Sequence, residues 1–213
     1  MLKYDAVQRL SCVVSCFASA GHAIAGVGFT MRLPTKKPPM ESATRQARFL
    51  FALKFLAIVM ATWGAYLPAL QCGFIWDDDD YVVENQTLRD TAGLWAIWTD
   101  PSATPQYYPL VHSTFWLEYQ AWGLNAMGYH ATNIFIHMLN ALFLWWLLVR
   151  LGVPIAWLAA LVFAIHPVHV ESVAWITERK NVLSGLFYFL SIHAFLSFWD
   201  FTKPVNEVDV ALE

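Results

Sequence analysis

Four consecutive aspartates, Asp77–Asp80, follow a long apolar segment in the stretch "FIWDDDDYVVEN". An ionised Asp at the centre of a membrane helix costs about 2.5–3.5 kcal/mol, so four of them must lie outside the hydrocarbon. The run predicts a general base, a cation site or both, with Mg²⁺ or Mn²⁺ as the open alternative for Asp79 and Asp80. The simpler interpretation is a solvated cap of the apolar segment. The sequence identifies no cofactor.

A second group of charged residues precedes the last apolar segment, in "HPVHVESVAWITERKN". Arg179 offers a planar fork of donors and Lys180 a point charge, and both suit a phosphate. Alternatively, Glu171 and Glu178 neutralise the two cations by pairing with them. The sequence leaves both interpretations open.

The same stretch begins with two histidines, His166 and His169, on either side of Pro167. Packing and hydrogen bonding are favoured over metal ligation for both histidines. Pro167 predicts a break in the helix, because proline removes a backbone donor and clashes with the preceding turn. The histidines and Glu171 would then fold back over the site and contribute to substrate binding.

Four polar residues, His130, Asn133, His137 and Asn140, share one face of a predicted membrane helix, because they are spaced three, four and three residues apart. Polar groups in a membrane helix face the bundle interior or a wet cavity. The face predicts either hydrogen bonds between helices or a role in substrate binding.

Carboxylates after the first apolar segment and cations before the last one fit one chemistry, the transfer of a sugar from a lipid phosphate to a hydroxyl. The leaving phosphate is already an anion, so it needs a cation rather than an acid. The acceptor hydroxyl needs a base, and one carboxylate suffices for a single inverting displacement.

The composition indicates a membrane protein that places these residues at one side of a bilayer. The 213 residues are 58% hydrophobic and only 14% charged, against about 25% in soluble domains. Residues 1–54 carry eight Lys and Arg against two acids, whereas residues 71–128 carry eight acids and one base. This asymmetry predicts a cytoplasmic N-terminus and extracytoplasmic site loops, in a bacterial inner membrane or the endoplasmic reticulum. The three cysteines predict no disulfide framework.

The predicted fold is an all-α polytopic membrane bundle of about four spans, with a tight turn in "RLGVP" that joins the middle two as a hairpin. The large outer loop, 71–128, is predicted to hold amphipathic helices rich in Trp, which either lie at the membrane interface or pack on the bundle. Residues 1–48 are predicted to be a cytoplasmic extension that is poorly ordered, or one that results from a mis-assigned start codon, in which case Met31 or Met40 begins the functional chain. A transmembrane module follows at 49–201, and a polar tail at 202–213. The predicted spans are 49–70, 129–149, 151–168 and 182–199.

Three stretches resemble the GT-C membrane glycosyltransferases, and in particular the TMTC and protein O-mannosyltransferase group, whose bacterial members often carry tetratricopeptide repeats. They are "FIWDDDDYVVEN", "QYYPLVHSTFWLEY" with the following "WGLNAMGYHATNIFIHMLNAL", and "HPVHVESVAWITERKNVLSGLFYFL", which together cover most of residues 70–190. The resemblance extends to the N-terminal part of such enzymes only.

The resemblance implies a polyprenyl- or dolichyl-phosphate sugar donor and Ser/Thr hydroxyl acceptors on a protein. Asp77 corresponds to the family's catalytic base, Asp78 to the second acid of its pair, and Arg179 to an arginine that holds the donor phosphate. Tyr108 stands where animal relatives carry Arg.

The expected partners are membrane lipid, the donor, the acceptor protein and a second chain with further helices; no nucleic acid is expected. The alternatives are a truncated inactive remnant and a cation-binding or transport module.

Overall fold

The structure is a computed structural model of the chain that describes residues 40–198, with side chains from residue 45 onward. Predictions for residues 1–39 and for the polar tail at 202–213 lie outside the described residues. From Thr44 onward the described residues belong to one compact unit.

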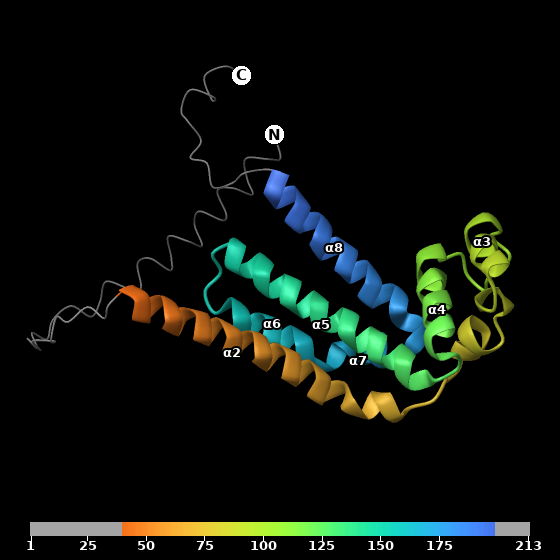
Figure 1. The fold of residues 1–213 in the computed structure, drawn as a ribbon, viewed down its shortest axis with the longest axis horizontal. Helices are drawn as coiled ribbons and strands as arrows, with labels where there is room; N and C mark the ends of the chain where they lie inside the picture. Colours follow the sequence, from red (N-terminus) through yellow and green to blue (C-terminus); the bar gives the residue numbers. More distant parts are fainter. Residues whose placement is uncertain (1–39, 199–213) are drawn as a thin grey trace, which may run out of the picture. The chain divides into compact units, whose positions relative to one another are not determined.

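All regular structure between residues 40 and 198 is helical, which confirms the predicted all-α class. Figure 1 shows the longer helices. In chain order the elements are α2 (Met40–Tyr66), η1 (Leu67–Gln71), η2 (Asp79–Val83), η3 (Gln86–Leu88), α3 (Thr91–Thr99), α4 (Pro109–Trp122), α5 (Ala126–Arg150), α6 (Ala156–Ile165), η4 (Pro167–His169), α7 (Val170–Ala174), η5 (Ile176–Glu178) and α8 (Arg179–Phe198).

Three helical segments in the described region are long and apolar enough to cross a membrane, namely Arg45–Gln71, Ala126–Arg150 and Ile176–Phe198. A fourth span exists only if α6 is joined to the segment Pro167–Ala174, from which it is bent by 47°. The predicted membrane bundle of about four spans is therefore confirmed. The break at Pro167 is also confirmed.

The helices and the predicted spans differ in their bounds. The first helix begins at Met40 and not at residue 49, so the end of the predicted extension is helical. The third span, predicted over 151–168, has only ten regular residues in α6, because Gly152 and Ile155 adopt positive φ angles of 69° and 52° and form the turn. The last helix begins at Arg179 rather than at residue 182, because its first cations have carboxylate partners.

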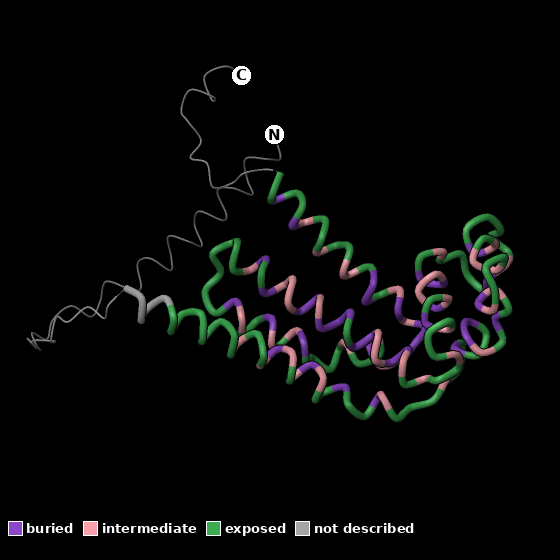
Figure 2. The backbone as a smooth tube through the Cα atoms, in the orientation of Figure 1, coloured by how far each residue is buried: buried purple, intermediate pink, exposed green. Residues whose placement is uncertain are grey.

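Helix α5 is the centre of the bundle and lies between α6 and α8 (Figure 1). One apolar cluster joins α2 to the α5–α6 hairpin, where small residues such as Ala141 and Ala160 let the helices approach closely. Trp145 of this cluster stacks on Phe51 of α2. Figure 2 shows buried positions along α5 and mostly exposed ones along α2. The exposed face of α2 is apolar, as a lipid-facing surface requires.

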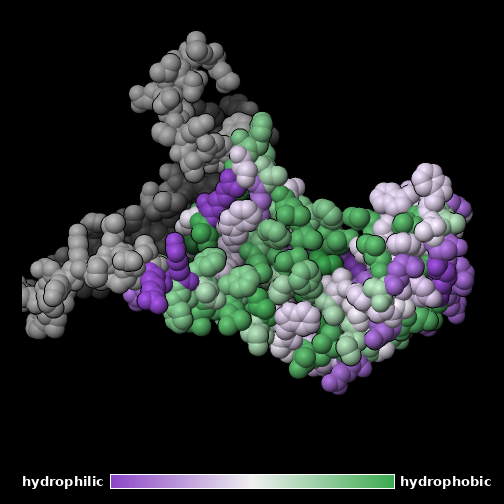
Figure 3. Space-filling view, viewed as in Figure 1, coloured by the Kyte–Doolittle hydropathy of each residue, from purple (hydrophilic) through white to green (hydrophobic). Residues whose placement is uncertain are grey.

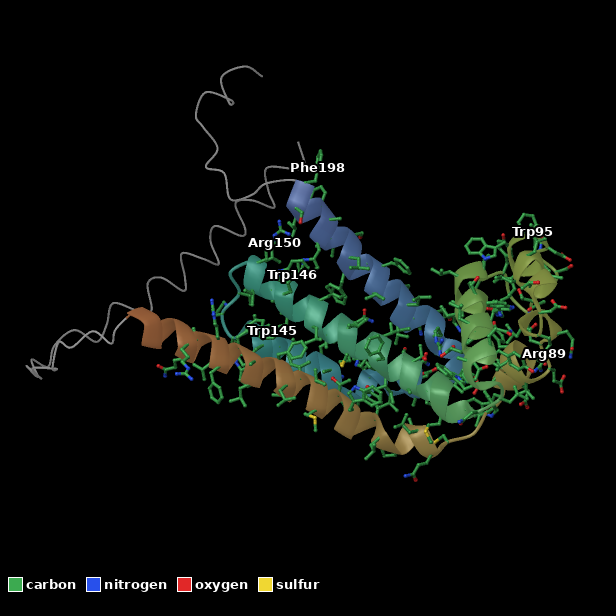
Figure 4. The ribbon with its side chains drawn as sticks, viewed as in Figure 1. Arg89, Trp95, Trp145, Trp146, Arg150 and Phe198 are labelled. Atoms are coloured by element: carbon green, nitrogen blue, oxygen red, sulfur yellow. The ribbon has the colours of Figure 1, made fainter. Side chains whose placement is uncertain are left out.

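Arg150 ties the last turn of α5 to the end of α8. Its guanidinium donates to the backbone oxygens of His193 and Leu196 and to the hydroxyl of Ser197. Leu196 belongs to the last turn of α8, whose carbonyls have no partner within the helix, whereas the His193 oxygen also accepts from the hydroxyl of Ser197. Figure 4 shows Arg150 beside the end of α8 marked by Phe198. A charged side chain from one helix therefore caps another.

The loop between α2 and α5 contains the predicted helices, α3 and α4. Asp90 caps α3, because its carboxylate accepts from the backbone N–H of Gly93 at 2.7 Å. Trp116 of α4 donates its indole N–H to the backbone oxygen of Asp90 at 2.7 Å. The position of these helices at the membrane interface stays a prediction.

Candidate functional site

Asp78 is the buried anchor of the aspartate run. Its side chain is 0% exposed and accepts two backbone hydrogen bonds of 3.0 Å, one from Ile75 and one from Thr177. The second bond connects the first loop to the segment just before α8. Burial raises the pKa of Asp78 above its ordinary value, although both hydrogen bonds oppose that shift. The run and the Arg179–Lys180 segment therefore lie together.

The other three aspartates, Asp77, Asp79 and Asp80, are exposed beside this anchor. Trp76, directly before them, adopts a left-handed backbone with φ of 49°. Such a conformation costs a bulky residue about 1–3 kcal/mol. An edge-on contact with Trp175, with ring centroids 5.2 Å apart, holds Trp76 in place. The strained turn buries Asp78 and leaves Asp77 accessible.

Arg179, the predicted phosphate ligand, is fully buried in a network within the protein. Its guanidinium forms an ion pair with Glu118 of α4 and donates to Asn133 and to the backbone oxygen of Tyr129 on α5. A further bond of 3.2 Å reaches the hydroxyl of Thr114. Because each of its nitrogens already has an acceptor, this geometry does not favour a phosphate at Arg179.

Lys180 is the more accessible cation of the pair. Its ammonium lies 2.6 Å from Glu178, and the side chain is 31% exposed. This bond confirms the predicted pairing for Glu178; Glu171 lies exposed on α7. Lys180 lines a groove of about 710 Å³ with Tyr108 and residues of the first turns of α8. The predicted site residues Tyr108 and Lys180 therefore share one opening.

The polar face of α5 is buried, as the spacing predicts, and three of its four residues hydrogen-bond to neighbouring segments. Asn133 donates to the backbone oxygen of Trp175 at 3.0 Å, and Asn140 to that of Val182 at 2.8 Å. His137 bonds to the backbone oxygen of Ala164 at 3.1 Å. The geometry supports the interpretation as hydrogen bonds between helices.

The histidines near Pro167 also have packing roles. His166 accepts from the backbone N–H of Val168 at 3.2 Å, and the ring of His169 packs on Phe163 with centroids 4.5 Å apart. No group of three or more His, Cys, Asp or Glu side chains in the described region is close enough to hold a metal. A cation site at the exposed Asp79 and Asp80 stays a prediction.

Two residues near the site, Glu118 and His112, were not predicted. Glu118 is the one acid of α4, and the only signal for it was the charge of Arg179 next to a membrane span, for which Glu171 and Glu178 were considered as partners. His112 is fully buried and stacks on Tyr81 with centroids 5.2 Å apart. Burial lowers the pKa of His112 to about 4 and raises that of Tyr81 to about 12. No sequence signal distinguishes His112 from an ordinary loop histidine.

These features define a helical membrane protein with an acidic turn, Asp77–Asp80, that is held in place by the buried Asp78 and lies near the partly exposed Lys180. No family model and no solved structure matches the chain. Mouse protein O-mannosyl-transferase TMTC3 is 31% identical over 161 residues, which are 71% of this chain and 17% of that protein. Human TMTC1 is 36% identical over 146 residues, 62% of this chain and 16% of that protein.

A third relative, the Caenorhabditis elegans protein O-mannosyl-transferase F38B6.6, is 31% identical over 72% of this chain and 24% of its own length. Over the matched residues the chain is a homologue of the TMTC protein O-mannosyl-transferases, which confirms the resemblance seen in its motifs. It spans less than a quarter of the length of each of these three relatives.

Proposed function

We propose that the chain carries the acidic part of a membrane sugar-transfer site of the GT-C type. The transfer would run from a polyprenyl-phosphate sugar to a Ser or Thr hydroxyl of a protein. The observation that supports this most is the bond from the Thr177 backbone N–H to Asp78, which brings the acidic turn to the segment that carries Lys180. The names of the relatives, protein O-mannosyl-transferases, agree with this chemistry.

Asp77 is the proposed base, because it is exposed while Asp78 is held by two backbone bonds. The acceptor oxygen forms a bond to the anomeric carbon as the carbon–phosphate oxygen bond breaks. The electron pair of that bond leaves with the phosphate, and the hydroxyl proton passes to Asp77. Attack opposite the phosphate inverts the anomeric centre.

Lys180 is the proposed contact of the donor phosphate, because it is partly exposed and lines the groove beside Tyr108. Arg179 is proposed as a positioning residue: its buried network fixes the start of α8 and therefore the position of Lys180. The extracytoplasmic location of the loop, the lipid donor and a second chain with further helices belong to the same proposal. No step requires a metal ion.

The test is transfer of a labelled sugar from polyprenyl-phosphate mannose to a Ser/Thr peptide. The wild-type chain and the variant Asp77→Asn are each purified from the cells that make the protein, together with any chain that co-purifies. We expect the variant to lose at least 100-fold in rate at equal protein level, because a positioned base contributes about 10²–10⁴-fold. Asp79→Asn is the matched control and should keep most of the activity.

Retained transfer in Asp77→Asn would exclude this residue as the base. If the wild-type preparation transfers no sugar and also fails to bind the labelled donor, the sugar-transfer proposal is wrong.

A further inference from the structure

A cavity at the other end of the spans from the acidic turn has no part in the proposed chemistry. It has a volume of about 550 Å³ and lies where the N-terminal half of α2 meets the α5–α6 turn. Figure 4 shows Trp145 on the side of α5 that faces α2, away from Arg150. The lining includes Phe51, Lys54, Trp145, Val149, Val153 and Trp157.

Lys54 is the only charged residue of this lining. Its ammonium lies 5.9 Å from the centre of the Trp157 ring, and no carboxylate in the described part of the chain pairs with it. The sequence has no Asp or Glu at 45–76 or at 119–170, and these ranges contain the whole lining. Lys54 lies about 14 Å along the helix from Arg45, where the apolar segment begins. Since cations within membrane spans are normally paired, this ammonium is available to an anion from outside the chain.

The other polar side chains of the lining are also hydrogen-bond donors. The indole N–H groups of Trp145 and Trp157 have no acceptor among the described residues. Helix α6 begins at the cavity with Ala156, and no side chain caps its first backbone N–H groups. The positive end of this helix adds to the charge of Lys54. A lining that offers a cation and donors suits a phosphate, because all the free oxygens of a phosphate are acceptors.

The apolar surroundings favour a lipid phosphate over a free one. A second cavity of about 200 Å³ adjoins the first, since Phe51, Trp145 and Val149 line both. It extends to Phe55 and Leu142, one turn further along α2 and α5 toward the middle of the spans. Figure 3 shows apolar surface over the helices, with hydrophilic residues gathered at the two ends. A phospholipid can therefore place its phosphate beside the cation and an acyl chain in the second cavity.

The charge at this end of the spans favours an anionic lipid over a zwitterionic one. Residues 45–76 carry three bases, Arg45, Arg48 and Lys54, and no acid. A zwitterionic head group brings its own cation, which these bases repel. The predicted orientation places this end at the cytoplasmic leaflet, which carries anionic lipids, and basic pockets between membrane helices on that side bind such head groups.

We propose that the cavity between α2 and the α5–α6 turn binds one anionic phospholipid. Lys54 pairs with the phosphate, and the indole of Trp157 and the first N–H groups of α6 complete its contacts. An acyl chain lies along Phe51 and Val149. The site is independent of the sugar-transfer proposal, because it lies at the opposite ends of α2 and α5 from the acidic turn.

The test is native mass spectrometry of the full chain in detergent, titrated with phosphatidylglycerol or with phosphatidylcholine of the same acyl chains. We expect the first phosphatidylglycerol to bind about tenfold more tightly than the first phosphatidylcholine. Lys54→Met, which keeps a long side chain and removes its charge, should abolish this preference, and Lys54→Arg should retain it. Val149→Trp, which fills both cavities, should exclude the lipid without changing the charge.

Arg45→Gln is the matched control. Nine residues are about two and a half helical turns, so Arg45 lies on the side of α2 opposite to Lys54 and its removal should not affect binding. Asp77→Asn should also bind phosphatidylglycerol like the wild type. Equal affinity for the two lipids, or equal losses in Arg45→Gln and Lys54→Met, would overturn the inference. Release of the lipid by inorganic phosphate would instead assign the cavity to a free phosphate and overturn the lipid assignment.

Discussion

At the scale of single residues, the four adjacent aspartates have different roles because they have different surroundings. Asp78 receives two backbone N–H groups and is buried, whereas Asp77, Asp79 and Asp80 are exposed. The left-handed backbone at Trp76 is what turns the second acid inward. The sequence predicted two candidate roles for the acids, as a general base and as a cation site. It did not predict their orientation, because in a run of identical residues only the turn decides which side chain is buried.

Asp78→Asn tests the anchor. The Asn side chain has one acceptor oxygen in place of two, so its NH₂ group faces one of the backbone N–H donors of Ile75 and Thr177. We expect a loss of about 1–3 kcal/mol in the free energy of unfolding. Thermal unfolding in detergent measures the change, with Asp79→Asn as the exposed control. Equal stability of the two variants would contradict the anchoring role.

His112 should make stability depend on pH. Its pKa is about 4 in the folded protein, against 6.5 ordinarily, because burial disfavours the cation. Between these values the unfolded chain binds more protons than the folded one, so stability falls as pH decreases from about 6.5 to about 4. The full effect is at most about 3 kcal/mol.

His112→Phe keeps the ring against Tyr81 and removes this titration. Unfolding midpoints measured between pH 7 and pH 4 should therefore change less in the variant than in the wild type. An unchanged slope would show that other groups cause the dependence.

At the scale of helices, the buried ion pair between Glu118 and Arg179 joins the loop to the bundle. Removing one member of such a pair leaves an uncompensated charge and typically costs about 3–5 kcal/mol, whereas replacing both by apolar residues is often neutral. The pattern of apolar residues predicted where the three long helical segments lie, because a membrane requires about 20 of them in sequence. The last span was predicted to begin at residue 182, whereas α8 begins at Arg179, because a charge normally ends a span. Here Glu118 of α4, 61 residues earlier in the chain, neutralises the charge of Arg179.

Gly93 fixes the contact between α3 and η3. A Cβ at this position would lie 2.1 Å from the backbone oxygen of Thr87, a distance that no local adjustment relieves. We expect Gly93→Ala to destabilise the loop by about 1–3 kcal/mol through overpacking. Gly64 in α2 has nothing within 4 Å, so Gly64→Ala is the matched control. Proteolysis of the loop in detergent measures the difference, and equal resistance of both variants would contradict the close contact.

At the scale of the whole molecule, the predicted orientation places the loop outside the cytoplasm and the α5–α6 turn inside it. Cys72 is exposed at the start of the loop and Val153 is 39% exposed in the turn. In a Cys12→Ser, Cys16→Ser background, an impermeant maleimide added to the extracytoplasmic side of sealed membranes should label Cys72. Val153→Cys, with Cys72→Ser added, should be labelled only after the membrane is opened. The reverse pattern would show the opposite orientation.

The capping of α8 by Arg150 also constrains the order of events during synthesis. The carbonyls that Arg150 bonds are translated 43 to 46 residues after it. At about 5–20 residues per second, the ribosome leaves this guanidinium without its final partners for several seconds. We expect Arg150 to stay in the head-group region during that interval, because its long side chain can keep the guanidinium in contact with water and lipid phosphates until α8 is synthesised.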